Sequence, residues 1–376
     1  MEGKLPETPV LKEPQGHPAE WFPVQEVNLD NGKLDIRDIH PETLREGKDI
    51  PLVSILGFGT GNAALSRTFI HLRDSGEHIL GIDFVGGGRG IEGEEGSSTE
   101  FNRQGELLYQ YLNDYLKNNP QIEQVDFMTQ SAGLLKVFAL AKLHPEFLPK
   151  IRNLIMYSPV GLYEKDHLTS PLRILKRFRD EEKRYKGSER KSELDEENNE
   201  NLKLANKRML RKWNPGDVLK AVKEVNALAR ASAYPTLEVL KATGIGIAVI
   251  QGEEDKLASA EMLWYKMGEG YEKPFSMIDT PDGPEYKPNN KKLFTQGISP
   301  LTDETINIYQ PQNQEPPLID VYRATSGGSF QEINGEKTVL PGGHGIQVDD
   351  PKKAAKTILG TIDYLNKLQS SPIENE

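Results

Sequence analysis

A short stretch of the chain changes from a strand pattern to a helix pattern with almost no loop between the two. A largely apolar run that starts at Val125 ends abruptly in the sequence Thr-Gln-Ser-Ala-Gly, residues 129–133. Apolar residues then recur along residues 134–141 at the spacing of one broad helix face. A strand that turns directly into a helix leaves the residue at the turn, here Ser131, pointing away from both elements.

Strand patterns and amphipathic helix patterns alternate along most of the sequence. An alternation of this kind is typical of a mostly parallel sheet with helices on both faces, which is the α/β class. A hairpin signal, Asp30-Asn31-Gly32, opens the chain between two alternating runs. The expected strands are residues 21–29, 33–39, 51–58, 79–84, 151–159 and 245–250, a strand from residue 125 to the turn at Ser131, and short strands over residues 321–330 and 336–340. The expected helices are residues 63–73, 100–119, 134–144 and 351–368.

Changes in composition divide the chain further. Residues 163–236 are strongly charged and carry helical patterns, so we interpret them as a helical cap inserted over the carboxyl edge of the sheet. The core domain then comprises residues 1–162 and 237–376. Within the core, residues 1–20 are expected to form a loose, proline-rich arm. Residues 268–318, which are rich in Pro, Gly and Asn, are expected to form a long irregular excursion.

The charge and the cysteine count exclude several classes of function. The 376 residues carry a formal net charge of −11, which disfavours nucleic acid and anionic membrane surfaces as partners. The sequence has no cysteine, which excludes disulfides, thiolate metal sites and a cysteine nucleophile. A secretory signal pattern and an apolar run long enough to cross a membrane are both absent. We therefore expect a cytoplasmic protein.

A glycine-rich turn between two predicted strands leaves two functions open. Gly57 and Gly59 match the first two glycines of a dinucleotide-binding fingerprint, and Asp83 lies at about the right distance to bind a ribose. Asn62 stands where the third glycine is expected. This stretch alone is compatible with an NAD(P)-dependent oxidoreductase. The glycine-rich loop 86–90 after Asp83 has no evident use in such an enzyme.

Three residues with complementary chemistry follow the ends of three predicted strands, in the chain order Ser131, Asp255, His344. Glycine-rich motifs surround the last two, Gly-Glu-Glu-Asp at residues 252–255 and Gly-Gly-His-Gly at residues 342–345. This order and these motifs resemble the α/β-hydrolases, in which a nucleophile elbow carries the serine. The resemblance covers about residues 50–162 and 238–368.

The resemblance implies a mechanism and a set of roles. Ser131 would be the nucleophile, His344 the general base, and Asp255 the acid that orients the imidazole, with Glu253 or Glu254 as alternative acids. The backbone N–H groups of Phe58 and Ala132 would form the oxyanion hole.

The expected activity is that of a carboxylesterase-like enzyme that acts on a small-molecule acyl substrate, an ester, thioester, amide or lactone. It needs neither a cofactor nor a metal. An acyltransferase with the same triad and an inactive binding protein on the same scaffold remain alternatives.

Three positions depart from the usual pattern of this fold. Thr129 stands two residues before the serine, where a small residue is common, and its branched side chain is expected to crowd the turn. Leu134 replaces another frequent glycine, and Leu56 replaces a frequent histidine at the oxyanion loop. None of the three removes a reacting group, but Thr129 puts the position of Ser131 in question.

Overall fold

The computed structural model describes the sheet and the helices around it. The described residues are 20–30, 32–45, 49–57, 61–85, 97–160, 240, 245–252, seven strands between residues 275 and 338, and 351–370.

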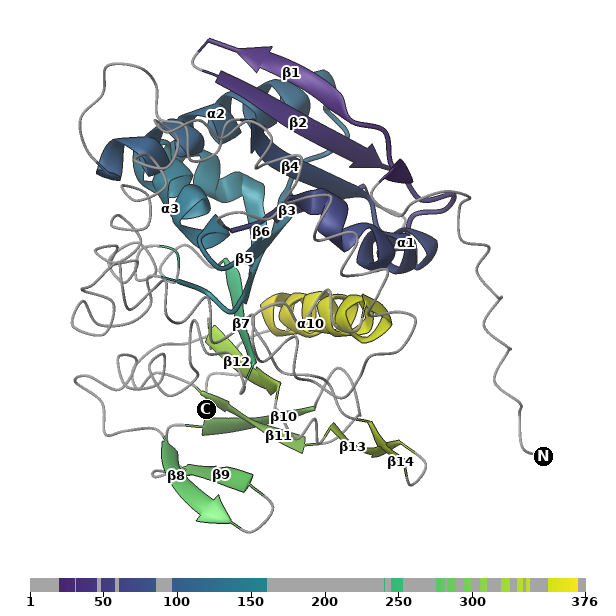
Figure 1. Cartoon of the computed structure of the whole chain (residues 1–376), viewed down its shortest axis with the longest axis vertical. Coiled ribbons are helices and arrows are strands. Elements are labelled where there is room, and N and C mark those ends of the chain that lie inside the picture. Colours follow the sequence, from purple (N-terminus) through teal and green to yellow (C-terminus); the bar gives the residue numbers. More distant parts are fainter. Residues whose placement is uncertain are drawn as a thin grey trace, which may run out of the picture.

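An eight-stranded sheet forms the centre of the described structure (Figure 1). The six strands from β4 to β12 are parallel, and β1 and β2 add an antiparallel ribbon at one edge, as the hairpin signal predicted. The predicted mostly parallel sheet is therefore confirmed. In spatial order the strands are β1 (Gln25–Leu29), β2 (Gly32–Ile39), β4 (Ile79–Val85), β3 (Leu52–Ile55), β5 (Val125–Gln130), β6 (Ile151–Tyr157), β7 (Gly246–Gly252) and β12 (Ile319–Ala324).

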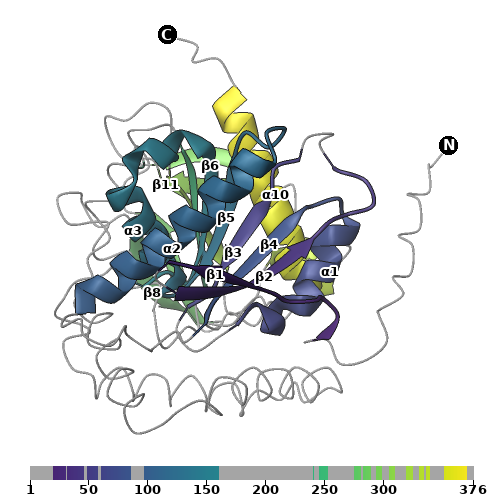
Figure 2. The same ribbon diagram turned by 90° about the horizontal axis from the view of Figure 1, so that it is seen from above.

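Helices cover both faces of this sheet, as seen from above in Figure 2. Helices α2 (Ser97–Asn118) and α3 (Gly133–Leu143) pack on one face, and α1 (Ser66–Asp74) and α10 (Pro351–Ser370) pack on the other. Neighbouring residues of a strand point to opposite faces. In β5, Phe127 accordingly belongs to the core under α2 and α3, whereas Met128 belongs to the core under α1 and α10. Two short 3-10 helices complete this part, η2 (Asn62–Leu65) before α1 and η3 (Pro145–Lys150) after α3.

The segment 268–318, for which a long irregular excursion is predicted, contains short strands among its described residues. It contains two antiparallel hairpins, β8 (Phe275–Thr280) with β9 (Gly283–Pro288) and β10 (Phe294–Ile298) with β11 (Thr305–Tyr309). The average composition of the segment hid its short strands. Thr280 pairs with Gly283, so two residues connect β8 and β9.

Two further strands follow β12, and they form a separate hairpin. They are β13 (Phe330–Ile333) and β14 (Glu336–Thr338). Residues 1–19 of the predicted arm 1–20 and the whole predicted cap 163–236 lie outside the described residues, so both remain predictions.

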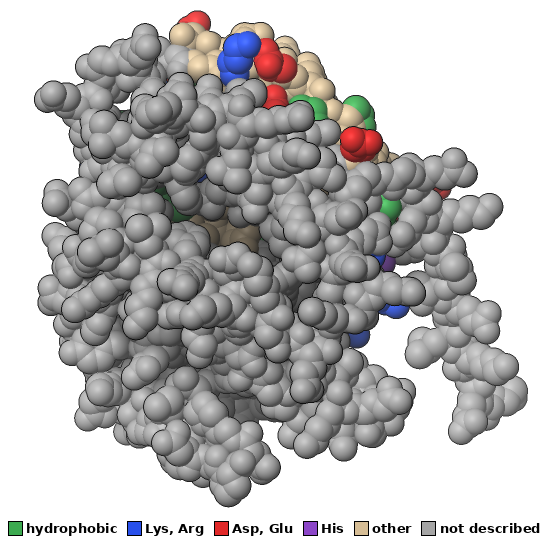
Figure 3. Space-filling view, in the orientation of Figure 1, with side chains coloured by type: hydrophobic (Ala, Val, Ile, Leu, Met, Phe, Trp, Pro, Cys, Tyr) green, Lys and Arg blue, Asp and Glu red, His purple; other side chains and the backbone are tan. Residues whose placement is uncertain are grey.

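Charged side chains of both signs lie on the visible described surface, over β1 and β2 (Figure 3). Lys33 and Glu26 of this ribbon form an exposed ion pair with a distance of 2.7 Å. Among the helices in the described part of the chain, none combines the length and the apolar character that a membrane crossing requires.

Candidate active site

Ser131 lies at a sharp turn between a strand and a helix. β5 ends at Gln130 and α3 begins at Gly133, so only Ser131 and Ala132 connect the two elements. The backbone of Ser131 has a φ of 52°, a left-handed conformation that residues other than glycine seldom adopt. A strained residue of this kind persists only where the surrounding structure holds it in place, and such residues cluster at functional sites.

Hydrogen bonds from the end of β6 and from a residue shortly after it hold the backbone of Ser131. Its N–H donates to the carbonyl of Tyr157 at 3.0 Å, and its carbonyl accepts from the N–H of Val160 at 3.3 Å. The relative exposure of the whole residue is 9%. The end of β6 therefore fixes the turn from one side.

Two glycines allow β3 to approach the turn closely. A Cβ atom on Gly133 would lie 2.2 Å from the carbonyl oxygen of Ile55, which is a severe clash. A Cβ atom on Gly57 would lie 2.7 Å from the Cβ of Ser131 and 3.1 Å from the amide nitrogen of Ala132. Both positions therefore require glycine, because the end of β3 and the turn touch through their backbones.

The structure accommodates Thr129, the departure that put the position of Ser131 in question. Thr129 lies inside β5, is 1% exposed, and pairs with Ile55 on one side and Met156 on the other. Its hydroxyl donates to the carbonyl of Ile155 at 3.5 Å, a long hydrogen bond. The branched side chain is thus part of the sheet and leaves the turn at Ser131 intact.

The other predicted site residues lie only partly within the described structure. Ala132 is buried at the N-cap of α3, and its amide nitrogen faces Gly57, the residue before Phe58. Phe58 itself and Gly59 lie outside the described residues, as do Asp255 and His344. β7 ends at Gly252, three residues before Asp255, and it runs parallel to β6 and β5. β7 therefore ends on the same side of the sheet as Ser131.

Lys136 was not anticipated from the sequence. It lies in the second turn of α3, is 7% exposed, and its ammonium donates to the carbonyl of Leu56 at 2.9 Å. The same ammonium lies 4.7 Å from the centre of the Phe84 ring, at the end of β4. Lys136 therefore ties the helix after the serine to the start of the predicted oxyanion loop. The available signal was a lysine inside the apolar run 134–141.

The contacts of Asp83 give this residue a role within the sheet. One carboxylate oxygen accepts from the guanidinium of Arg37 at 2.7 Å. The other accepts from both the backbone and the side-chain amide of Asn62, each at 2.8 Å. Asn62, which breaks the dinucleotide fingerprint, thus binds the acid that was the candidate ribose ligand. The sheet order also differs, because the antiparallel strand β2 flanks β4 where a dinucleotide-binding fold continues with a parallel strand.

These features define the fold. A serine with positive φ between a central parallel strand and its helix, at the point where the strand order reverses between β3 and β5, is the arrangement of the α/β-hydrolase fold. The chain has this fold, as the sequence motifs predicted.

Solved structures show the same fold. A hydrolase from Pseudomonas aeruginosa PA01 is similar with a TM-score of 0.51 and 13% identity, over 90% of this chain and 98% of that one. An N-acyl homoserine lactone degrading enzyme, Est816, is similar with a TM-score of 0.51 and 14% identity, over 89% of this chain and 99% of that one. No protein-family profile and no curated protein sequence matches this chain. At such low identity, the likeness concerns the fold.

Proposed function

We propose that this protein is a serine hydrolase that cleaves an ester, thioester, amide or lactone through an acyl-serine intermediate. The observation that carries the proposal is the conformation of Ser131, which has a φ of 52° at the tip of the turn between β5 and α3. A serine that only capped the helix would need no positive φ, because an N-cap residue normally has an extended backbone. The strain at Ser131 is instead what a nucleophile elbow requires.

The proposed reaction proceeds in two halves. The hydroxyl oxygen of Ser131 attacks the acyl carbon while His344 takes the hydroxyl proton, and Asp255 stabilises the imidazolium. The tetrahedral intermediate expels its alcohol, thiol or amine, which receives the proton from His344. Water then attacks the acyl-serine, with His344 again as the base, and releases the acid and the free serine.

Two backbone donors would stabilise the negative oxygen of the intermediate, the N–H of Ala132 and that of Phe58. The close approach of Gly57 to the amide nitrogen of Ala132 supports this pairing, since Phe58 follows Gly57 directly. Lys136 would act as a positioning residue, because it holds the carbonyl of Leu56.

We propose a small acyl compound as the substrate, beneath a cap formed by residues 163–236. The lactone-degrading activity named for one neighbour and the hydrolase description of another are consistent with this class, although the likeness itself concerns the fold. An acyltransferase would share every step up to the acyl-serine and differ only in the acceptor that replaces water.

A fluorophosphonate probe tests the proposal, because it phosphonylates only an activated serine. We expect one adduct per chain on Ser131, seen by mass spectrometry of the intact protein and its peptides. Ser131→Ala should abolish the adduct, and His344→Ala should slow its formation strongly.

Folded protein that forms no adduct on Ser131 would overturn the hydrolase proposal. Saturable quenching of tryptophan fluorescence by NAD or NADP, in protein that the probe does not label, would instead support the oxidoreductase alternative. A substrate that is hydrolysed without an acceptor would separate the hydrolase from an acyltransferase.

A further inference from the structure

A second cluster of reactive side chains lies at the end of the sheet where the parallel strands begin, whereas Ser131 lies at the end where they finish. It comprises Asp38 at the end of β2, His40 just after it, His78 just before β4, and Asp49 before β3. Parallel strands begin at one edge of a sheet and end at the other, and Ser131 follows the end of β5. The second cluster is therefore separate from the proposed catalytic site.

The sheet itself brings the two histidines together. β2 and β4 are antiparallel, and their pairing ends with Ile39 opposite Ile79. The next residues along each strand are His40 and His78, which continue this register. Their rings lie 4.0 Å apart between centroids, with an angle of 31° between the ring planes. The juxtaposition follows from the backbone register and not only from the side-chain rotamers.

Three candidate ligand atoms converge at this point. The Nε2 of His78 lies 2.7 Å from the Oδ1 of Asp38, and the Nε2 of His40 lies 3.1 Å from the same oxygen. All three atoms lie within 4.8 Å of one another. Ligand atoms bound to one tetrahedral Zn²⁺ at about 2.0–2.1 Å are separated by about 3.3 Å, so shifts of under about 1 Å would bring these three into place.

Asp49 orients the buried histidine. Its Oδ1 lies 2.5 Å from the Nδ1 of His78, whose side chain has no exposed surface. A carboxylate that accepts the Nδ1–H of a histidine directs the Nε2 lone pair to the opposite side, which is the usual support of a metal-binding imidazole. The hydroxyl of Tyr115 also approaches this Nε2, at 3.5 Å.

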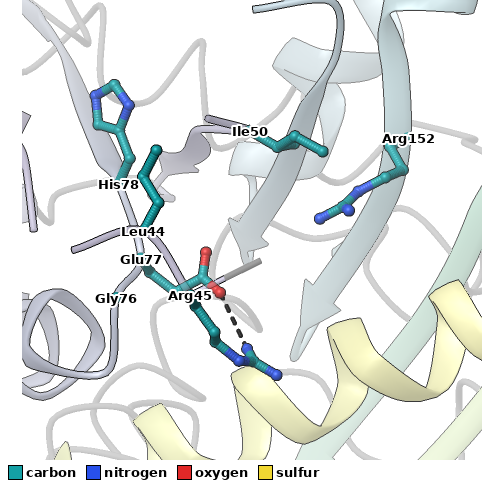
Figure 4. Close-up of a pocket in the computed structure, with 7 residues that line it drawn as sticks. All are labelled: Leu44, Arg45, Ile50, Gly76, Glu77, His78 and Arg152. Atoms are coloured by element: carbon teal, nitrogen blue, oxygen red, sulfur yellow. Dashed lines mark hydrogen bonds and ion pairs between the residues drawn. The ribbon is translucent and has the colours of Figure 1, made fainter. Parts of the chain in front are cut away.

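The neighbouring arginine is directed elsewhere. Figure 4 shows His78 and Arg45 extending in opposite directions, with Arg45 reaching toward helix α10. Its guanidinium binds Glu77 at 3.0 Å and also Asp363 of α10. Arg45 thus forms its ion pairs with these two acids. The carboxylates of Asp38 and Asp49 instead contact histidine nitrogens.

We propose that Asp38, His40 and His78 form a binding site for a divalent transition-metal ion, with Zn²⁺ as the best match. Two imidazole nitrogens and one carboxylate oxygen are a typical ligand set for this ion. The side chains of Asp38 and His40 are 34% and 60% exposed, so water can reach the fourth position. The ion would join the end of β2 to the start of β4.

Protonation of His78 is the competing explanation of the same contacts. An imidazolium at His78 would donate to Asp38 and Asp49 at once, and this pair of hydrogen bonds needs no metal. The two accounts differ at His40, which a bridging proton does not require and a metal site does. The experiment therefore centres on His40, whose exposed side chain is replaced with little risk to folding.

The test uses the full chain, stripped with a chelator and titrated with Zn²⁺ by calorimetry, with Mg²⁺ in a parallel titration. We expect saturable binding of one Zn²⁺ at this site and no response to Mg²⁺, which prefers oxygen ligands. His40→Gln should lower the Zn²⁺ affinity by more than about tenfold, and Asp49→Asn by about tenfold. Zn²⁺ at about 100 times the wild-type Kd should raise the Tm of the wild-type chain by about 5 °C and that of His40→Gln by at most about half as much.

His144 provides a matched control. It also lies between two carboxylates, at 2.6 Å from Glu106 and 3.1 Å from Glu146, but its ring stacks on Tyr109 rather than on a second histidine. His144→Gln should leave Zn²⁺ binding unchanged. Binding that survives His40→Gln undiminished, or the lack of saturable binding up to about 1 mM Zn²⁺, would overturn the metal site and leave the proton-bridged cluster as the explanation.

Discussion

Replacing Gly57 by alanine would push the oxyanion loop and the proposed nucleophile apart. The new Cβ would lie 2.7 Å from the Cβ of Ser131 and 3.1 Å from both the amide nitrogen of Ala132 and the carbonyl oxygen of Gln130. Carbon atoms in contact normally stay about 3.5–4.0 Å apart, so the two segments must separate by about 1 Å. A displacement of this size at a reacting group costs about a hundredfold in rate, or about 2.7 kcal/mol of the activation barrier.

The rate of fluorophosphonate labelling measures this effect directly, since it depends on the nucleophile and the oxyanion donors and needs no known substrate. We expect the second-order labelling rate of Gly57→Ala to fall by about a hundredfold, while circular dichroism shows a folded protein. Gly81→Ala in β4 is the control. Its Cβ would lie 3.2 Å from side-chain atoms of Asn62, a tight contact with no part in the turn, so labelling should stay near the wild-type rate. A folded Gly57→Ala protein that is labelled within about threefold of wild type would refute the proposed geometry.

Three further predictions concern buried charged groups. Lys136→Met should slow fluorophosphonate labelling by about tenfold with little change in Tm. Lys142→Met, on the exposed side of the same helix, should change neither the labelling rate nor the Tm. Equal labelling rates for the two variants would contradict the positioning role of Lys136. Arg152→Met should lower the free energy of unfolding, measured in urea, by about 3–5 kcal/mol. The reason is that Asp126, which is 1% exposed, would keep its charge without the guanidinium of Arg152. A loss of unfolding free energy below about 1 kcal/mol would contradict this. The third concerns pH: burial of the His78 ring disfavours its charge, but hydrogen bonds to two carboxylates outweigh burial and raise the pKa of His78. In chelator, its stabilisation is therefore complete below the ordinary pKa of 6.5 and is lost as the pH rises through the higher folded pKa, so the Tm advantage over His78→Gln should shrink as the pH is raised above 6.5. An advantage that grows as the pH is raised would contradict the sign.

Local patterns in the sequence determined the class of the fold. Alternating buried-strand and amphipathic-helix periods predicted the parallel sheet, and the Asn-Gly turn predicted the antiparallel ribbon at its edge. The abrupt change of period at Ser131 located the turn that the structure confirms. These features are readable because each depends on residues that are close together in the chain. The hairpins of 268–318 were missed because strands of five or six residues disappear in the average composition of a long segment.

Tertiary contacts decided what the same residues do. Asp83 fits a ribose ligand as well as a structural acid in the sequence, and only its bonds to Arg37 and Asn62 give it a place in the sheet. Thr129 looked too large for the turn, yet the pairing of β5 with β3 and β6 holds it inside the sheet.

Lys136 and the cluster at His78 depend entirely on partners far away in the chain. Lys136 reaches Leu56, eighty residues before it, and His78 meets Asp38, forty residues before it. A single sequence carries no sign of such pairs, because only the strand order and the register of the sheet bring them within bonding distance.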